Sequence, residues 1–371
     1  MYHIYENNDD YGQWVGVSDF GIKIKGMNGS AHLFANARNM VAVNVYIKPI
    51  DLNGKAISIS NPNILKHVSL IDYDTGEEIL MDQQTWKYDV PRWSYTTTPN
   101  EFTELSDIYH SSTKKLTAEF NAELATTNMV TFYVYCFQTE AIKIGVFIKT
   151  PSGHEYTTRD NESKQSGFNP YIQLIGVPKI IYSTNNLEIK SYPSNQDDDN
   201  DDEHFWEYHN IYISCKESLL HGKRRIIKSE AHKIEKPIDA KPGGKYDFEF
   251  DSPYSYYRGY EYSPNSGSDF ILHYLWNLSP VKDVQLGDHI GLPDFKLHID
   301  ITATINEAPG ALCITVLCLS NIIGDLGPYI GVSPISIYDQ YGNRGSFVIN
   351  SYFDTNYYDI QLKPVSIDSD C

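Results

Sequence analysis

Positive charge is scarce in this sequence. Lysine and arginine together number 30, against 48 aspartates and glutamates, which gives a formal net charge of −18. A field of this sign repels phosphate backbones and anionic lipid, and non-specific nucleic-acid binding requires a basic surface. Nucleic acid is therefore not an expected partner.

Cysteine is also sparse. The five cysteines are odd in number and irregularly spaced, which excludes a disulfide framework. Cys313 and Cys318 lie on one predicted strand at an odd offset, so they face opposite sides and cannot bridge each other. We expect buried free thiols, which are typical of a protein that folds in a reducing cytosol.

Two kinds of apolar segment are missing. The N-terminal residues 1–14 have neither a basic region nor an apolar core, so no Sec signal peptide is expected. The longest apolar stretch, residues 311–332, is interrupted by Ser320, Asn321 and Asp325, which argues against a transmembrane segment. We expect synthesis in the cytoplasm, and a non-Sec route or lysis if the protein acts outside its cell.

Helix-forming stretches rich in Leu, Ala and Glu are rare, whereas Tyr, Ile, Val, Thr, Asn and Asp abound. This mixture favours strands joined by polar turns. The apolar alternation of Val41, Val43, Val45 and Ile47 predicts a half-buried strand. Residues 130–138 and 311–320 are the strongest strand predictions. Residues 102–124 could form one short helix.

One strand–turn–strand motif recurs along the chain. Its turn contains Asp or Pro followed by Gly. Such turns lie at residues 51–54, 74–76, 151–153 and 339–343, and the first predicts a return strand over residues 56–60. The recurrence predicts an all-β fold with two tandem β-sandwich domains, Ig-like or jelly-roll-like, and at most one or two short helices. The hairpins resemble those of bacterial Ig-like adhesin modules.

The length of 371 residues favours two domains. Residues 1–25 are expected to form an N-terminal arm or first strand, residues 26–178 the first sandwich, and residues 179–371 the second. Six of the seven residues from Asp197 to Glu203 are acidic, so residues 195–204 are expected to form an exposed loop of the second domain.

Few motifs of catalysis or metal binding are present. The sequence has no P-loop, no GxGxxG and no HExxH, so no cofactor is expected. Residues 72–76 imitate the start of a calcium loop, but position twelve of that loop is Gln83 rather than a bidentate glutamate. We therefore predict no metal site and no catalytic residue from these motifs.

One acidic strand offers an enzymatic alternative. In residues 246–251, Glu249 and Asp251 share one face of a predicted strand, and a carboxylate pair is what glycoside hydrolysis needs. Glu249-Phe-Asp251 resembles the start of the E-x-D-x-x-E signature of laminarinase-type glycosidases. The third acid of that signature is replaced here by Pro253 or Tyr254. An acidic, water-facing strand is the simpler interpretation.

A tyrosine cluster follows that strand. Tyrosine combines a rigid ring with a polar tip, which suits recognition surfaces, although such rings also pack in cores. Pro, Gly and Ser surround the cluster, so we expect a Tyr-rich loop. The candidate binding residues are Tyr254, Tyr256, Tyr257, Arg258, Tyr260 and Tyr262.

The sequence therefore favours recognition over catalysis. The first hypothesis is a β-sandwich binding protein, such as a toxin or adhesin-like component, that contacts a host-cell glycan or protein surface through the Tyr-rich loop. The alternatives are a self-assembling structural protein of a particle, fibre or inclusion, which would be a homo-oligomer, and a glycoside hydrolase using Glu249 and Asp251.

Overall fold

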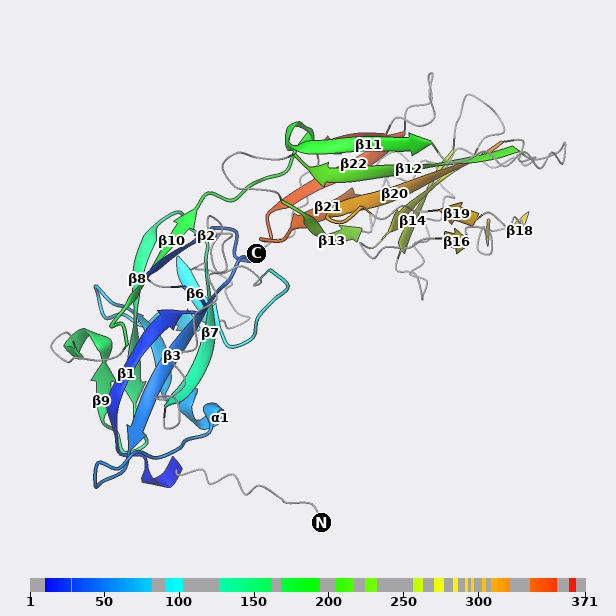
Figure 1. Ribbon diagram of the computed structural model, residues 1–371. Coiled ribbons are helices and arrows are strands. Elements are labelled where there is room, and N and C mark those ends of the chain that lie inside the picture. Colours follow the sequence, from blue (N-terminus) through cyan, green and yellow to red (C-terminus); the bar gives the residue numbers. More distant parts are fainter. Residues whose placement is uncertain are drawn as a thin grey trace, which may run out of the picture. The chain divides into compact units, whose positions relative to one another are not determined.

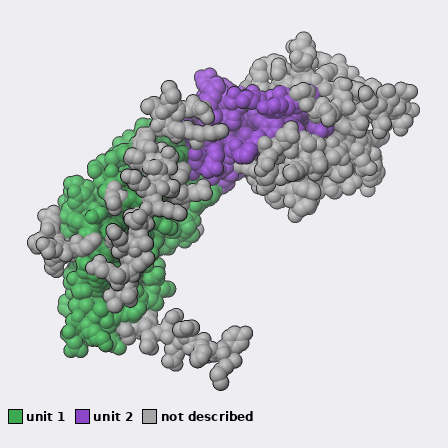
Figure 2. All heavy atoms as spheres, in the orientation of Figure 1, with its two compact units in different colours: residues 1–180, 341–343, 371 green, residues 181–340, 344–370 purple. Residues whose placement is uncertain are grey.

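The computed structural model describes two compact units built almost entirely from β-strands. Unit 1 comprises residues 1–180, 341–343 and 371, and unit 2 comprises residues 181–340 and 344–370; Figure 2 colours them separately. The described residues are 11–27, 29–81, 91–102, 127–161, 168–193, 205–216, 224–231, 256–262, 270–276, 283–285, 291–292, 295–296, 302–304, 308–320, 334–351 and 360–364. The expected all-β class is confirmed.

Unit 1 contains two five-stranded sheets (Figure 1). The first has the order β1 (Gly16–Ile24), β3 (Val41–Ile50), β7 (Asn128–Cys136), β6 (Trp93–Thr96) and β5 (Leu80–Met81). The second has the order β2 (Ser30–Phe34), β10 (Ile172–Val177), β8 (Ala141–Lys149) and β4 (Val68–Asp72), with β9 (Glu155–Thr157) also paired to β8. The pairs β2–β10 and β5–β6 are parallel, and the other pairs are antiparallel.

One apolar core joins these two sheets. The first sheet contributes every second residue of β3 and β7, and the second contributes the inward residues of β4, β8 and β10. The four residues of the predicted alternation along β3 are fully buried: Val41, Val43, Val45 and Ile47. Ala42 and Asn44 between them are buried as well, so the strand alternates between buried and half-buried residues only from Val45 onward. Two sheets that share one core in this way form a sandwich.

Unit 2 also contains two larger sheets. The first has the order β11 (Leu187–Pro193), β12 (Phe205–Cys215), β20 (Ala311–Ser320), β15 (Phe270–Trp276) and β14 (Tyr256–Tyr262). The second has the order β13 (Ile226–Ala231), β21 (Pro334–Asp339), β22 (Arg344–Ser351) and β23 (Ile360–Pro364). Two short pairs complete it: β16 (Asp283–Gln285) with β19 (Thr302–Thr304), and β17 (Gly291–Leu292) with β18 (Phe295–Lys296).

A buried polar contact links the entry of unit 2 to its second sheet. The hydroxyl of Tyr182 donates to Asp339 Oδ2 at 2.8 Å, and both side chains are buried. Burial raises the pKa of the Tyr182 hydroxyl, and the charge of Asp339 raises it further. The tyrosine therefore stays protonated and serves Asp339 as a donor.

Helix is limited within the described residues. They contain one α-helix, the four-residue α1 (Asn61–Ile64), and three short 3₁₀ turns, η1 (Tyr11–Gln13), η4 (Thr158–Asn161) and η5 (Thr184–Asn186). The expected helical stretch over residues 102–124 lies almost wholly outside the described part of the chain. None of the helices that the structure describes has the length and apolarity to cross a membrane.

Two of the four expected Gly-turn hairpins are confirmed, β8–β9 and β21–β22. After the turn at residues 74–76 only an isolated bridge between Ile71 and Glu78 forms, and β5 pairs with β6 of the other sheet instead of with β4. The expected return strand over residues 56–60 is wrong. After the turn at Gly54, only an isolated bridge between Ile50 and Ala56 forms. Ile57 and Ile59 are nevertheless buried in the core of unit 1. Their alternation reflects anchoring of an irregular segment rather than strand pairing.

The expected free thiols are confirmed where the structure describes them. Cys136, Cys215 and Cys313 are buried and unbridged. Burial raises the pKa of Cys136 and Cys313 to about 12 and that of Cys215 to about 11. Because the thiolate is the reactive form, these side chains behave as small core residues.

The core of unit 1 can be tested with two substitutions of the same type. Leu70 is fully buried on β4, whereas Leu52 is 85% exposed in a turn. Leu70→Ala should destabilise the protein by about 2–5 kcal/mol, because it removes buried methyl groups and leaves a cavity. Leu52→Ala should change stability by no more than about 0.5 kcal/mol. Thermal unfolding of both variants measures this, and equal effects would contradict the described core.

Candidate functional site

The Tyr-rich segment forms a strand rather than the expected loop. Residues Tyr256–Tyr262 are β14, which pairs antiparallel with β15 from Tyr256 opposite Trp276 to Tyr262 opposite Phe270. β14 ends the path of its five-stranded sheet. The high β-propensity of tyrosine explains why the segment is extended despite the Pro, Gly and Ser that flank it.

The candidate residues Tyr256, Tyr257, Arg258, Tyr260 and Tyr262 therefore share one strand at the end of a sheet path. Tyr254 lies outside the described residues. The carboxylates Glu249 and Asp251 and the acidic segment 195–204 also lie outside them. The role of these residues in binding or catalysis stays a prediction.

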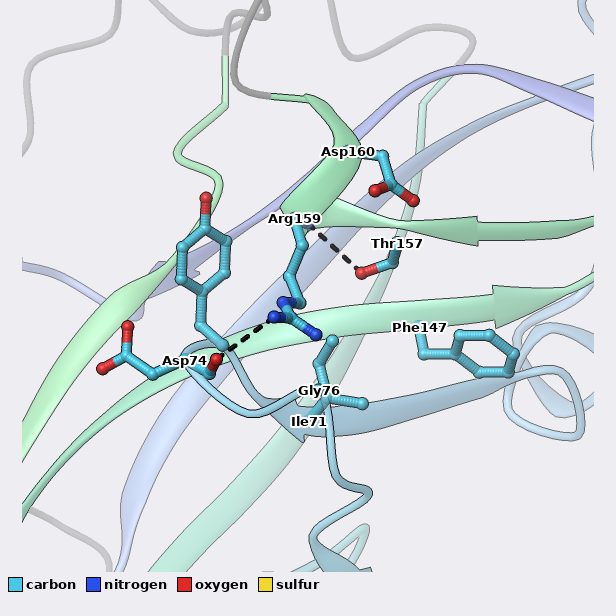
Figure 3. A pocket seen from close by; sticks show the side chains of 8 residues that line it. Ile71, Asp74, Gly76, Phe147, Thr157, Arg159 and Asp160 are labelled. Carbon is cyan, nitrogen blue, oxygen red and sulfur yellow. Dashed lines mark hydrogen bonds between the residues drawn. The ribbon is translucent and has the colours of Figure 1, made fainter.

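A surface cleft in unit 1 has the most clearly defined geometry (Figure 3). It lies beside the turn after β4, strands β8 and β9, and η4, and has a volume of about 660 Å³. Its lining combines two carboxylates, a guanidinium, a hydroxyl and two aromatic rings with smaller groups: Ile71, Tyr73, Asp74, Gly76, Phe147, Thr157, Arg159 and Asp160. We name it the β4–η4 cleft.

The turn after β4 forms one wall of the cleft. The side-chain oxygen Oδ1 of Asp72 accepts from the backbone N–H of Asp74 at 2.8 Å and of Thr75 at 3.2 Å. The N–H of Gly76 donates to the carbonyl of Asp72 at 2.7 Å. The calcium-like spacing therefore serves a turn in which Asp72 binds its own backbone. Gln83 lies outside the described residues.

Arg159 of η4 braces this turn across the cleft. Its Nη1 donates to the carbonyl of Thr75 and its Nη2 to the carbonyl of Asp74, both at 3.1 Å. Figure 3 shows the guanidinium reaching toward Asp74. Gly76 has a φ of +83°, and a Cβ at that position would overlap Nη1 of Arg159. The backbone conformation thus favours glycine at position 76, and a larger side chain there would also displace the end of the Arg159 side chain.

η4 is itself anchored to strand β8. The N–H of Val146 donates to the hydroxyl oxygen of the fully buried Thr158 at 3.0 Å. The hydroxyl of Thr157 accepts from the backbone N–H of Arg159 at 3.2 Å. Arg159, which braces the turn, is therefore fixed to strand β8 through its neighbour Thr158. This anchoring pre-organises the cleft.

Lys143 binds the outer side of the turn. Its ammonium lies 3.0 Å from Asp74 Oδ1. The hydrogen bond and the charge of Asp74 raise the pKa of Lys143. The same ammonium lies 5.5 Å from the ring centre of Tyr171, which is 39% exposed and packs against Tyr73 with ring centres 4.8 Å apart. Lys143 thus occupies one oxygen of the Asp74 carboxylate.

Asp160 has a different environment. Its side chain is exposed at the rim of the cleft, and its carboxylate forms no hydrogen bond or ion pair with any residue that the structure describes. It is thus the lining carboxylate whose acceptor sites stay open. Within the described ranges, no three His, Cys, Asp or Glu side chains lie close enough to hold a metal ion together.

The turn at Asp74 and Gly76 follows from the sequence pattern. Thr157, Arg159 and Asp160 were not predicted as site residues. These two groups lie more than eighty positions apart in the sequence, as the hydrogen bond from Arg159 to Asp74 shows. Pairing of both β4 and β9 with β8 brings them together. Thr157, Arg159 and Asp160 follow the β8–β9 hairpin without any motif of their own.

Comparison with known proteins identifies no family. No protein-family model matches the chain, and no curated protein does. Among solved structures, the chain is similar to the collagen-binding domain of Erysipelothrix rhusiopathiae surface protein RspB, with 10% identity, coverage of 95% of each chain and a TM-score of 0.12. At that TM-score the similarity carries no argument, so the cleft is interpreted from its own geometry.

The brace between Arg159 and Gly76 can be tested with a matched glycine. Gly153 also has a positive φ, of +89°, but a Cβ there would meet nothing within 4 Å. Gly153→Ala should cost about 1–2 kcal/mol from backbone conformation alone. Gly76→Ala should cost more, because it also displaces the guanidinium.

A double-mutant cycle completes this test. In an Arg159→Ala background, the cost of Gly76→Ala should fall to that of Gly153→Ala, because the overlap is gone. Unfolding free energies of the four proteins give the coupling. An unchanged cost in both backgrounds would show that Arg159 does not occupy the space beside Gly76.

Proposed function

We propose that this protein is a non-enzymatic recognition protein that binds a partner molecule in the β4–η4 cleft. The observation that carries the proposal is the open carboxylate of Asp160 at the rim of a braced, mixed polar and aromatic cleft. Ligand sites are concave, of about 300–1,000 Å³, with a few placed polar groups. The volume of about 660 Å³ fits this range.

Rigidity of the cleft supports binding. A site held in its bound shape loses less conformational entropy when the ligand arrives. Arg159 donates to two turn carbonyls, Asp72 accepts from two turn N–H groups, and Thr158 ties η4 to β8. These contacts hold both walls without any ligand.

The lining supports recognition rather than glycoside hydrolysis at this cleft. That reaction uses two carboxyl groups, one as acid and one as base or nucleophile. Here Asp74 is bound by the Lys143 ammonium, whereas Asp160 is open. The two carboxylates therefore differ in availability, and a single open carboxylate suits an acceptor of ligand hydrogen bonds.

Strand β14 of unit 2 is the second contact surface in this proposal. Its position at the end of a sheet path supports it, since terminal strands are sites where other molecules approach. The composition of the strand, four tyrosines and Arg258 among seven residues, is typical of recognition surfaces. A glycan or a protein surface would be the partner.

The cleft can be tested by binding of the full chain to an array that carries neutral glycans, acidic glycans and peptides. Asp160→Asn should weaken binding to any cleft ligand by about tenfold or more, because hydrogen bonds to charged groups contribute about 1.5–3 kcal/mol. Glu188→Gln is the control, because Glu188 is an exposed carboxylate of unit 2 paired with Lys190. Equal binding by both variants would place the ligand elsewhere.

The β14 surface has its own test. Tyr256→Ala with Tyr257→Ala should reduce partner binding by about 2 kcal/mol or more if the strand is a recognition hot spot. Stability should then change by no more than about 0.5 kcal/mol. If both rings are core residues instead, the pair should lower the melting temperature strongly, since burying a large aromatic contributes about 3–5 kcal/mol.

A further inference from the structure

We infer that the ligand of the β4–η4 cleft is a neutral glycan, an oligosaccharide segment without carboxylate, sulfate or amine groups. The inference rests on the proposed function of this cleft and specifies its ligand. Three properties of the lining lead to it: the balance of its charges, its pattern of hydrogen-bonding groups and its aromatic walls.

Charges of both signs line the cleft. Asp160 and Asp74 are negative, Arg159 is positive, and the Lys143 ammonium lies 3.0 Å from Asp74. An anionic ligand that binds Arg159 would lie beside the like charge of Asp160, and a cationic ligand that binds Asp160 would lie beside the like charge of Arg159. A ligand of either sign therefore meets one repulsive neighbour, which lowers its net gain. A neutral ligand avoids this penalty.

The net charge of the chain disfavours one class of charged ligand, the anions. At −18, the protein repels sialylated, sulfated and uronate-rich glycans at long range. Screening limits this repulsion to about 8 Å at physiological salt, so it disfavours but does not exclude acidic sugars. Neutral sugars are unaffected.

The hydrogen-bonding groups match vicinal hydroxyls. Arg159 uses two of its side-chain N–H groups on the turn carbonyls, and a guanidinium carries five. The neighbouring Asp160 supplies carboxylate oxygens that only accept, and the Thr157 hydroxyl can still donate. A sugar hydroxyl both donates and accepts. Adjacent hydroxyls could therefore bind Asp160 and Arg159 together, as neither a simple anion nor a simple cation can.

Aromatic side chains provide the remaining contact. Phe147 is half-buried and supplies the accessible ring of the cleft, whereas Tyr73 also lines the cleft but is buried against Tyr171. Figure 3 shows Phe147 on β8, on the far side of Arg159 from Asp74. Apolar C–H groups on one face of a pyranose gain from covering such a ring, as buried apolar area does in general. The cleft thus offers both surfaces that a sugar presents.

The array should include pairs that differ only in charge: neutral galactose-, glucose- and mannose-terminated oligosaccharides, their sialylated or sulfated forms, amine-bearing chitosan fragments, and neutral peptides. We expect binding to at least one neutral glycan. Raising the salt from about 50 to about 500 mM should leave that binding within about twofold, because Debye screening weakens only charge-dependent contacts.

Two variants connect the binding to the cleft. Asp160→Asn and Phe147→Ala should each weaken neutral-glycan binding about tenfold or more, whereas Glu188→Gln should leave it unchanged. Thermal unfolding of each variant distinguishes lost contacts from lost folding. Because Phe147 is only half-buried, Phe147→Leu serves as a second variant that keeps an apolar side chain but removes the ring.

The outcomes separate the two levels of the proposal. Cleft-dependent binding that is restricted to acidic glycans, amine-bearing glycans or peptides would overturn the neutral-glycan inference and leave the recognition function intact. Binding that none of the cleft variants alters, or no binding to any probe, would overturn the proposed function of the cleft as well.

Discussion

The backbone hydrogen bonds of strand β8 hold together both the second sheet of unit 1 and its cleft. β8 pairs with β10, β4 and β9, and its residues Ile144, Val146 and Ile148 are fully buried in the shared core. The turn after β4 and the 3₁₀ turn after β9 are therefore positioned by one strand. The polar side chains of the cleft rest on an apolar support, which suits a site that must keep its shape.

The all-β class and many of the strands could be predicted from strand periodicity and turn residues in the sequence. Val41, Val43, Val45 and Ile47 lie in the core as their alternation predicts, and the Gly-containing turns join paired strands at two of four positions. Alternation alone could not distinguish a paired strand from an anchored irregular segment, so Ile57 and Ile59 were correctly apolar but wrongly assigned to a strand. The Pro, Gly and Ser residues around the tyrosine cluster led to the prediction of a loop, whereas the high β-propensity of tyrosine agrees with the observed strand β14.

The cleft was much harder to foresee. A turn with Asp72, Asp74 and Gly76 is visible locally, but its brace comes from Arg159, which sheet pairing alone brings near. No spacing rule connects such positions, because register between strands far apart in sequence depends on the whole core. The proposed binding role of the exposed Asp160 also depends on the residues that surround it in the fold. Its openness becomes meaningful only beside the fixed guanidinium and the aromatic rings.

The contact between Gly76 and Arg159 has an evolutionary consequence. Any side chain at position 76 would meet both a left-handed backbone and the guanidinium, so the two positions form one unit of variation. A lineage that loses the arginine would relax the spatial constraint on the glycine, although the backbone constraint would persist. In a family of related chains, departures from glycine at position 76 should therefore be more frequent among sequences that lack arginine at position 159.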